Sequence, residues 1–352
     1  MVVAALAAIG GSAQTLPPLS SNASVYATGL DNPRGLKFGP DGALYVAEGG
    51  RGGIFGSGSL CKQVAAPIGP YTAGSTGRIS RIGLAGARST VVDGLPSSQT
   101  SKDSGSLISG VADVAFVGNQ MYALISGGGC SHGVPSVPNG VIRVDMNRGT
   151  WVPFADLSAF LKANPVANPP DDDFEPDGTF YSMVTYIDRL FIVNPNSGEI
   201  DEVSAEGKVQ RVVDISESHG HVVPTALTYH DGWYFGNLFL FPVHQGSANV
   251  YRLGDGKRVH VVVPEVTTVT GVAFDSKNRL YILEMSAAEG NPAPGQGKVL
   301  RREADGQLKE IATGLSFPTA MTFGPNGVLY VSNNGFGYPA GAGQVVAVKV
   351  PE

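Results

Sequence analysis

One phrase occurs near both ends of the chain, and this internal repeat constrains the fold more than any other feature. It reads PRGLKFGPDGALYVA from Pro33 to Ala47 and PTAMTFGPNGVLYVS from Pro318 to Ser332. Four weaker copies lie between them, at residues 111–124, 182–193, 225–236 and 270–283. Each copy places two short apolar segments around a turn, mostly of Asp, Asn and Gly, which predicts a β-hairpin. Six hairpins in tandem predict a closed array of repeats, because one hairpin cannot bury both of its faces alone.

The aromatic residue at the end of each first strand sets the register of the repeat: Phe38, Phe116, Tyr186, Tyr229, Phe274 and Phe323. The last three spacings, of 43, 45 and 49 residues, suit four-stranded propeller blades, and the first two, of 78 and 70 residues, require insertions. The final repeat stops at its third strand, at residues 343–350, so residues 25–30 must supply the fourth. We therefore predict an all-β, six-bladed β-propeller with four-stranded antiparallel blades, whose ring is closed by an N-terminal strand that completes the last blade.

The N-terminal segment differs in character from the rest of the chain. Residues 1–13 are apolar and end in small side chains, as a secretory signal peptide does, although no Lys or Arg precedes the apolar stretch. We predict a signal peptide at 1–13 and a single propeller domain at 14–352, with a secreted or periplasmic location. The alternative is a frayed apolar terminus. One short helix is predicted near residues 155–163 as a cap on the domain.

The charge of the chain excludes one class of partner. The net charge is −6, charged residues make up 15 % of the chain, and no basic run occurs, which argues against a nucleic-acid site. The N-terminal apolar stretch is too short to span a membrane. The expected partner is therefore a small molecule, a glycan or a protein.

The long insertions all occupy one kind of position in the repeat. They follow a second strand or precede a first strand, at residues 49–76, 96–110, 127–139, 155–179 and 285–297. In a four-stranded meander both positions open on the same face, so this loop-bearing face is predicted to carry the function. The candidate ligand-binding residues lie near the starts of first strands or in one of these loops: Arg34, Asp113, His132, Thr225, Thr270 and Thr319.

Four phrases also stand out as a set: ATGLDNPRGL from Ala27, GPDGALYVAE from Gly39, TGRISRI from Thr76 and FPTAMTFGPNGVLYVSN from Phe317. In this order they resemble the ScyD/ScyE family, which is named for the scytonemin biosynthesis cluster. The similarity extends from about residue 22 to the end of the chain. It implies a secreted propeller of the NHL-like kind, and it implies no established reaction and no catalytic residues.

Five of the six residues that end second strands can offer an oxygen atom to a cation, and the sixth is Ile125. The five are Glu48, Asn194, Asn237, Glu284 and Asn333. If they line the inner rim of the loop-bearing face, they suit calcium or magnesium, in the manner of propeller lactonases of the gluconolactonase kind. The alternative is that Asn and Glu end strands because their side chains satisfy backbone groups at the turn.

Two further segments depart from the family pattern. His219 and His221 precede the first strand of the fourth repeat, where either could act as a general base; a plain surface loop is the alternative. Residues 171–177 imitate the first half of a calcium loop, but Val184 stands where its closing Glu should be. A looser calcium site and a solvated acidic loop remain as readings of that segment.

The two cysteines of the chain, Cys61 and Cys130, fall in loops of adjacent repeats on the same face. A disulfide between them would close a loop of about 70 residues and stabilise the fold by about 4 kcal/mol. Two buried thiols are the alternative. The signal-like start favours the disulfide, because secreted proteins fold under oxidising conditions.

Two functions remain open, since the sequence contains no nucleophile elbow, phosphate-binding loop or dinucleotide fingerprint. The first is a binding or accessory protein that uses its loop-bearing face. The second is a calcium- or magnesium-dependent hydrolase of the lactonase kind, or a lyase, with its site at the mouth of the central channel and His219 or His221 as base. The first is favoured because no complete catalytic constellation is present, and whether the protein is an enzyme stays open.

Overall fold

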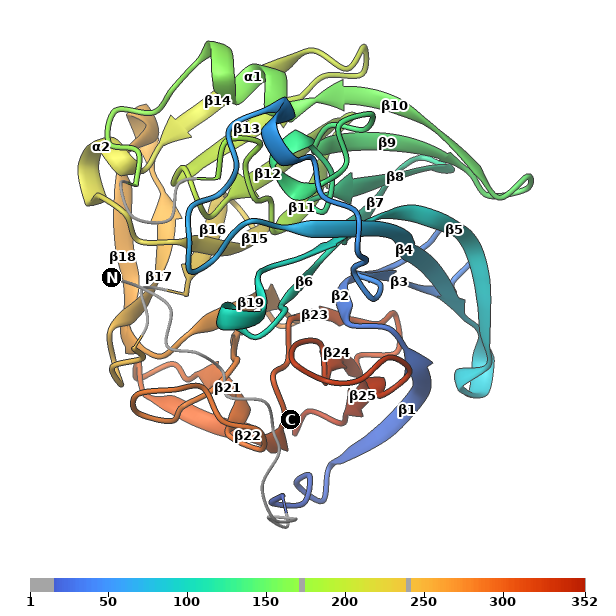
Figure 1. The fold of residues 1–352 in the computed structure, drawn as a ribbon. Helices are drawn as coiled ribbons and strands as arrows, with labels where there is room; N and C mark the ends of the chain where they lie inside the picture. Colours follow the sequence, from blue (N-terminus) through green and yellow to red (C-terminus); the bar gives the residue numbers. More distant parts are fainter. Residues whose placement is uncertain (1–15, 171–174, 239–241, 352) are drawn as a thin grey trace.

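A computed structural model describes residues 16–170, 175–238 and 242–351, and within them six sheets stand around a common axis (Figure 1). Each sheet is an antiparallel meander whose first strand lies at the axis, so the predicted six-bladed β-propeller is confirmed. The predicted signal peptide at 1–13 and the three aspartates at 171–173 lie outside the described residues.

The strands follow the chain around the ring. Blade one contains β2 (Pro33–Phe38), β3 (Leu44–Glu48), β4 (Thr72–Ile82), β5 (Arg88–Gln99) and the short β6 (Ile108–Ser109). Blade two contains β7 (Val111–Val117), β8 (Gln120–Ile125), β9 (Gly140–Asp145) and β10 (Thr150–Asp156), and blade three contains β11 (Ser182–Tyr186), β12 (Arg189–Asn194), β13 (Glu199–Val203) and β14 (Val209–Asp214). Blade four contains β15 (Pro224–Tyr229), β16 (Trp233–Asn237), β17 (Ala248–Leu253) and β18 (Val259–Val266). Blade five contains β19 (Val269–Phe274), β20 (Leu280–Glu284), β21 (Gly297–Arg302) and β22 (Leu308–Leu315).

Blade six joins the two ends of the chain. It contains β23 (Ala320–Phe323), β24 (Leu329–Asn333) and β25 (Gly343–Val348), and β1 (Ala23–Leu30) is its outermost strand. β1 pairs antiparallel with β25, with Ala23 opposite Val348 and Leu30 opposite Gly343. This is the ring closure that the sequence predicted, and it leaves β25 paired on both sides.

Neighbouring blades pack through the aromatic residues that set the repeat. Phe116 of blade two meets Tyr45 of blade one edge to face, with ring centroids 5.1 Å apart. The same contact recurs from Phe323 to Tyr281, at 5.0 Å, and from Phe38 to Tyr330, at 5.2 Å. Such pairs stabilise by more than their buried area alone. The aromatic residue of each first strand is therefore part of the seam between two blades.

The connections differ between the two faces as the sequence predicted. Hairpin turns and the turns between third and fourth strands are short, whereas the segments after second strands and before first strands include the longest in the chain. The helix expected near 155–163 is present as α1 (Leu157–Ala163), which begins at Asp156, whose carboxylate accepts the Ala159 N–H. A second short helix, α2 (Ser216–His219), precedes blade four. Neither described α-helix has the length and apolar character needed to cross a membrane.

Candidate functional site

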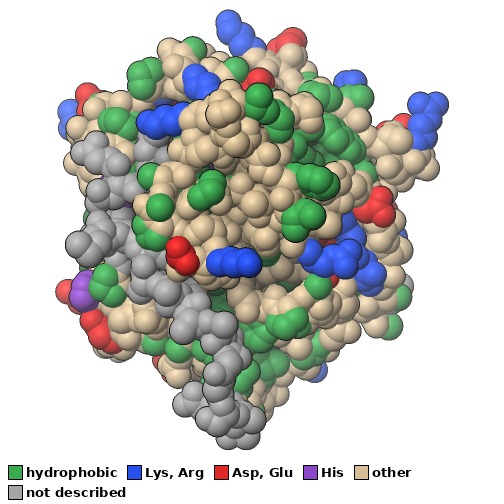
Figure 2. Space-filling model, in the orientation of Figure 1, with side chains coloured by type: hydrophobic (Ala, Val, Ile, Leu, Met, Phe, Trp, Pro, Cys, Tyr) green, Lys and Arg blue, Asp and Glu red, His purple; other side chains and the backbone are tan. Residues whose placement is uncertain are grey.

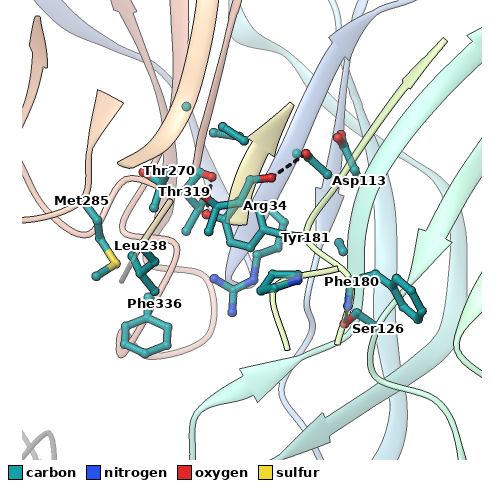
Figure 3. Close-up of a pocket in the computed structure, with 18 of the residues that line it drawn as sticks. Arg34, Asp113, Ser126, Phe180, Tyr181, Leu238, Thr270, Met285, Thr319 and Phe336 are labelled. Atoms are coloured by element: carbon teal, nitrogen blue, oxygen red, sulfur yellow. Dashed lines mark hydrogen bonds between the residues drawn. The ribbon is translucent and has the colours of Figure 1, made fainter. Parts of the chain in front are cut away.

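The main cavity of the described structure follows the propeller axis and has a volume of about 600 Å³. The first strands of all six blades line it, and loops of the loop-bearing face line the end of the cavity that opens on that face (Figure 3). Its size falls within the range of about 300–1,000 Å³ that is typical of small-molecule sites. Figure 2 shows the surface over this region, where uncharged atoms predominate in the middle of the face. The arrangement suits a small organic ligand better than a polyanion.

One residue from each blade forms a ring in the cavity wall near the loops: Arg34, Ala112, Tyr181, Thr225, Thr270 and Thr319. The three threonines connect neighbouring blades. Thr225 Oγ1 donates to the Val269 carbonyl (2.5 Å), and Thr270 and Thr319 donate to the first residues of the next blades, Pro318 (3.0 Å) and Pro33 (2.7 Å). Because each hydroxyl proton is used between blades, these threonines can offer a ligand acceptor oxygens only.

Tyr181 crosses the channel. It belongs to blade three, and its hydroxyl donates a 2.7 Å hydrogen bond to the carbonyl of Thr319 in blade six, the opposite blade of the ring. Burial raises the pKa of the Tyr181 hydroxyl well above its ordinary value, so this group is a neutral donor at neutral pH. The hydrogen bond of Tyr181 therefore connects two opposite blades across the cavity.

Arg34 lies beside Tyr181, in the part of the cavity nearer the loop-bearing face (Figure 3). Its Nη1 donates to the Gly335 carbonyl (2.6 Å) and its Nη2 to the Ile108 carbonyl (2.5 Å), which come from loops on either side of blade one. The guanidinium carbon lies 5.9 Å from the centre of the Phe336 ring. Burial lowers the pKa of Arg34, although a guanidinium remains charged at neutral pH.

Elsewhere in the cavity wall, the buried Asp113 carboxylate forms an ion pair with Lys37, whose side chain is 30 % exposed. Lys37 Nζ lies 3.7 Å from Asp113 Oδ2, and the Asp113 carboxylate also accepts the backbone N–H groups of Val114 and Met183, both at 2.9 Å. Burial raises the pKa of Asp113, and Lys37 counteracts part of that rise. Gly35 makes the arrangement sterically feasible, because a Cβ atom at that position would lie 1.9 Å from Asp113 Oδ1.

His132 is the one predicted ligand-binding residue that does not line the cavity; the other five do. It is fully buried behind Tyr71 and Glu175, which form part of the cavity wall. His132 Nε2 lies 3.3 Å from Glu175 Oε2, His132 Nδ1 lies 3.1 Å from Ser98 Oγ, and Tyr71 donates a 2.6 Å hydrogen bond to Glu175. The cluster fixes the Glu175 carboxylate to the wall.

The five oxygen-bearing residues at strand ends do not meet at the channel. None of Glu48, Asn194, Asn237, Glu284 and Asn333 lines the cavity, which corrects the expectation that they form its rim. The residues that follow three of them, Pro195, Leu238 and Met285, line it instead. The reason is geometric: first strands form the channel wall, and the end of each second strand lies behind them.

Each of these side chains has protein partners in its own part of the ring. Glu48 accepts hydrogen bonds from Arg78 (2.6 and 2.8 Å) and from the Asp31 N–H (2.6 Å), and Asn194 accepts the Asn196 N–H. The other three also accept backbone N–H groups: Asn237 from Asn249, Glu284 from Thr267 and Asn333 from Ser316. Satisfaction of backbone groups, the alternative interpretation, describes them well, and they do not fit a shared central cation. Within the described residues, no group of three or more His, Cys, Asp and Glu side chains is placed to hold a metal ion.

The two histidines proposed as a base also lie apart from the cavity wall. His219 ends α2, with its ring 5.6 Å from that of Tyr251 and its Nδ1 2.8 Å from Ser218 Oγ. Burial lowers the pKa of His219. His221 is partly buried two residues later. Neither histidine lies on the wall that would contact a ligand in the cavity.

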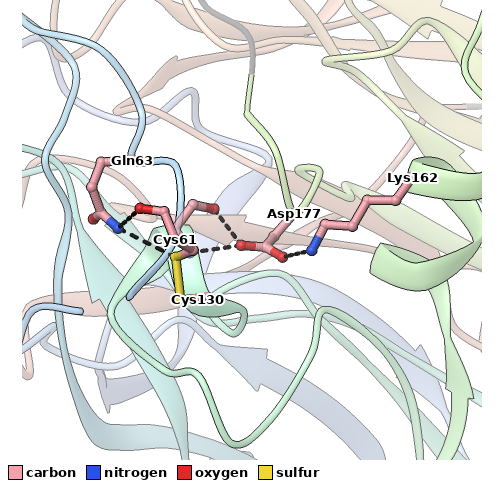
Figure 4. Close-up of a disulfide and its surroundings, with 6 residues drawn as sticks. Cys61, Gln63, Cys130, Lys162 and Asp177 are labelled. Carbon is pink, nitrogen blue, oxygen red and sulfur yellow. Dashed lines mark hydrogen bonds and ion pairs between the residues drawn. A yellow bond between two sulfur atoms is a disulfide. The ribbon is translucent and has the colours of Figure 1, made fainter. Parts of the chain in front are cut away.

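The predicted disulfide between Cys61 and Cys130 is present, with Cα atoms 6.2 Å apart (Figure 4). It connects the loop after β3 with the loop after β8. Asp177, from the loop before blade three, accepts hydrogen bonds from the N–H (2.6 Å) and Oγ (2.5 Å) of Ser131, next to Cys130, and pairs with Lys162 of α1 at 2.7 Å. Three insertions are thus held together beside the cavity.

Sequence reasoning missed Tyr181, because counting back from the aromatic residue of each first strand gives Ser182 instead. The hairpins of blades one, two, four and five contain a register shift near the start of the first strand, whereas the hairpins β11–β12 and β23–β24 pair without one. The residue that faces the channel therefore does not lie a fixed number of residues before the aromatic residue. Phe336 and Lys37 were missed as well, although Lys37 belongs to β2, the same first strand as Arg34.

Comparison with known proteins supports the fold and leaves the family open. No protein-family model matches the chain, and no curated protein matches it. A Bacteroides thetaiotaomicron protein of unknown function has a TM-score of 0.58 at 11 % identity, over 94 % of this chain and 77 % of that one. A putative oxidoreductase (glucose dehydrogenase) from Thermus thermophilus has a TM-score of 0.52 at 16 % identity, over 94 % of this chain and 100 % of that one. A putative gluconolactonase has a TM-score of 0.51 at 12 % identity, over 95 % and 94 %. At such identities the likeness concerns the propeller fold alone.

Proposed function

We propose that this protein is a secreted or periplasmic propeller of the ScyD/ScyE kind that binds a small molecule in its central channel, from the loop-bearing face. The observation that supports this best is the cavity of about 600 Å³, which all six blades line. The disulfide agrees with an oxidising compartment. The phrases that resemble the family, from Ala27, Gly39, Thr76 and Phe317, support the family assignment.

Binding can be tested with the uncharged fluorescent probe N-phenyl-1-naphthylamine, whose emission rises in apolar sites. The unaltered protein should bind it saturably. Ala320→Trp, which fills part of the cavity from β23, should abolish that binding, because Ala320 lines the channel. Val152→Trp places the same side chain on the outer strand β10, where Val152 is 48 % exposed, and should leave binding unchanged. Equal binding by all three proteins would place the probe elsewhere and contradict the proposal.

The alternative function is a calcium- or magnesium-dependent hydrolase or lyase, which the likeness to a putative gluconolactonase keeps in view. It requires metal ligands other than the five strand-end residues as the structure places them, since those oxygens accept backbone N–H groups. Elemental analysis of the purified protein and melting with and without calcium separate the two functions. A bound divalent ion together with a calcium-dependent rise in Tm would favour the enzyme.

Secretion has its own test. The full chain, expressed in a bacterial host, should appear outside the cytoplasm with the N-terminus removed near residue 13. Intact mass of the exported protein checks this. Retention of Met1 in exported material, or accumulation in the cytoplasm alone, would contradict the secretory assignment.

A further inference from the structure

Among the described residues, the charged side chains of the cavity wall leave one cation without a counter-ion. In the described structure these residues are Arg34, Lys37, Asp113 and Glu175. Lys37 and Asp113 pair with each other, and Glu175 is held by Tyr71 and His132. The polar contacts of the Arg34 guanidinium are with the backbone carbonyls of Gly335 and Ile108. Arg34 therefore brings an uncompensated positive charge into a largely apolar cavity.

Arg34 differs in this respect from the other arginines of the protein. In the described part of the chain, every other partly or fully buried arginine has a carboxylate within 2.5–2.9 Å: Arg78, Arg81, Arg211, Arg279 and Arg301. Enclosing an unpaired charge disfavours folding, so buried arginines are normally paired. The exception lies in the cavity wall, where a ligand can supply the missing negative charge.

The two carbonyls also fix the orientation of the guanidinium. They come from Ile108, in the loop region before blade two, and from Gly335, in the loop after β24, so the side chain is held from both sides. A guanidinium carries more N–H donors than these two contacts use. The remaining donors are preorganised, which reduces the entropy lost when an anion binds.

The surroundings of Arg34 indicate what else the ligand must carry. Apolar side chains line the cavity around it, among them Leu238, Met285 and Phe336 (Figure 3). A single guanidinium matches a singly charged, planar carboxylate, with which arginine forms bidentate hydrogen bonds. A phosphate dianion would need further donors, and the ring threonines offer acceptor oxygens only.

We propose that the channel binds a small molecule that carries one carboxylate on an apolar or aromatic body, with the carboxylate on Arg34 and the body among Leu238, Met285 and Phe336. This inference rests on the function proposed above and adds the chemical class of the ligand to it. The part of the cavity nearer the loop-bearing face is thus a site for an amphipathic monocarboxylate.

The test compares three compounds that share one aromatic body: 1-naphthoate, the uncharged 1-naphthamide and 1-naphthyl phosphate. Binding to the unaltered protein is measured by titration calorimetry at about pH 7, where the carboxylate is ionised. Naphthoate should bind at least about tenfold more tightly than naphthamide, because a hydrogen bond to a charged group contributes more than a neutral one. Naphthoate should also bind more tightly than the phosphate.

Variants at Arg34 assign the preference to this residue. Arg34→Met keeps the length of the side chain and removes its charge, so naphthoate and naphthamide should then bind about equally. Arg34→Lys keeps the charge without the planar fork and should retain a reduced preference for naphthoate. Arg279→Met is the matched control, since Arg279 is equally partly buried but pairs with Asp275 outside the cavity, and it should leave the preference intact.

The outcomes separate this inference from the proposed function. Equal binding of naphthoate and naphthamide to the unaltered protein, or a preference that survives in Arg34→Met, overturns the inference and leaves small-molecule binding in place. Tighter binding of the phosphate overturns the choice of a carboxylate. Failure of all three compounds and of N-phenyl-1-naphthylamine overturns both proposals. If Arg34→Met does not fold, the unaltered protein and Arg34→Lys still decide the question.

Discussion

The backbone N–H of Asp31 donates a 2.6 Å hydrogen bond to the carboxylate of Glu48, which lies 17 residues later in the chain. The same bond, with the same spacing, joins Thr267 to Glu284 and Ser316 to Asn333, both at 2.7 Å. In each case the residue that ends a second strand holds the segment through which the chain enters that blade. A polar residue at this position is therefore part of the repeat itself.

Glu48→Ala should lower the free energy of unfolding by about 3 kcal/mol, because the change removes the buried carboxylate that binds both Arg78 and the Asp31 N–H, and leaves Arg78 only its longer contact with the Asp31 carboxylate, at 3.5 Å. Equilibrium unfolding in urea measures the loss. Glu217→Ala removes an exposed carboxylate from α2 and should change stability little. Equal effects of the two substitutions would contradict a structural role for Glu48.

Gly35→Ala should destabilise the protein by about 1–3 kcal/mol or more, because the new Cβ atom would overlap Asp113 Oδ1, only 1.9 Å away. Gly56→Ala is the control, since its nearest neighbour would be the Tyr71 carbonyl at an ordinary 3.6 Å. Thermal unfolding of both variants checks this. A Gly35→Ala protein as stable as the Gly56→Ala protein would show that Asp113 moves aside without cost.

The ring architecture was predictable because its signals are local. The Asp41–Gly42 and Asn326–Gly327 turns predict their hairpins from a few residues alone. The spacing between Phe274 and Phe323 indicates the number of strands in a blade without any tertiary information. Ring closure followed from the same count, because a blade that ended at β25 lacked one strand.

The site was predictable only in part, because it depends on contacts between distant loops. Arg34 and Thr319 line the cavity wall, and they share a position in the repeat. Tyr181 lies one residue outside that count, in a hairpin that pairs without a register shift, and no local pattern marks the difference. The contact between His132 and Glu175 spans two insertions with no common repeat position, so nothing in the sequence reports it. The strand-end oxygens were candidates both for a metal site and for satisfaction of backbone groups, because the residue type alone suits both roles.

Tyr181→Phe should keep the shape of the cavity and lose the hydrogen bond across the channel to the Thr319 carbonyl. We expect a loss of about 1 kcal/mol in unfolding free energy, with the buried carbonyl left unsatisfied. Urea unfolding measures this, and binding of N-phenyl-1-naphthylamine should persist. Tyr229→Phe is a control at an exposed tyrosine, whose hydroxyl bonds to Tyr186 outside the cavity. If Tyr181→Phe behaves like Tyr229→Phe, the bond across the channel does not contribute to stability.

Cys61→Ser combined with Cys130→Ser should lower stability by about 2–4 kcal/mol, since the bond closes a long loop in the unfolded chain. Unfolding is followed with and without a reducing agent. Reduction should lower the Tm of the unaltered protein to that of the double variant and leave the variant itself unchanged. A Tm that does not respond to reduction, in a protein whose mass shows an intact bond, would contradict the predicted contribution.

Asp201, on β13, is fully buried, and its carboxylate oxygens have no hydrogen-bond partner within the described structure. Burial, reinforced by the neighbouring Glu199, raises the pKa of Asp201 well above its ordinary value. A carboxyl group whose pKa is raised by folding favours the folded state fully below its unfolded pKa of about 3.9. That contribution is lost as the pH rises through the folded pKa.

Asp201→Asn removes the titration and keeps the size of the side chain. The variant should therefore melt at least about 2 °C above the unaltered protein at pH 8, and the advantage should shrink as the pH falls towards the unfolded pKa of about 3.9, below which Asp201 is protonated in both states. Melting curves across this pH range measure the difference. Asp255→Asn, at an exposed position, should show no such trend. A variant no more stable than the unaltered protein at pH 8 would mean that the surrounding blade stabilises the ionised Asp201 carboxylate. Burial of that charge would then not destabilise the folded protein, which would contradict the prediction.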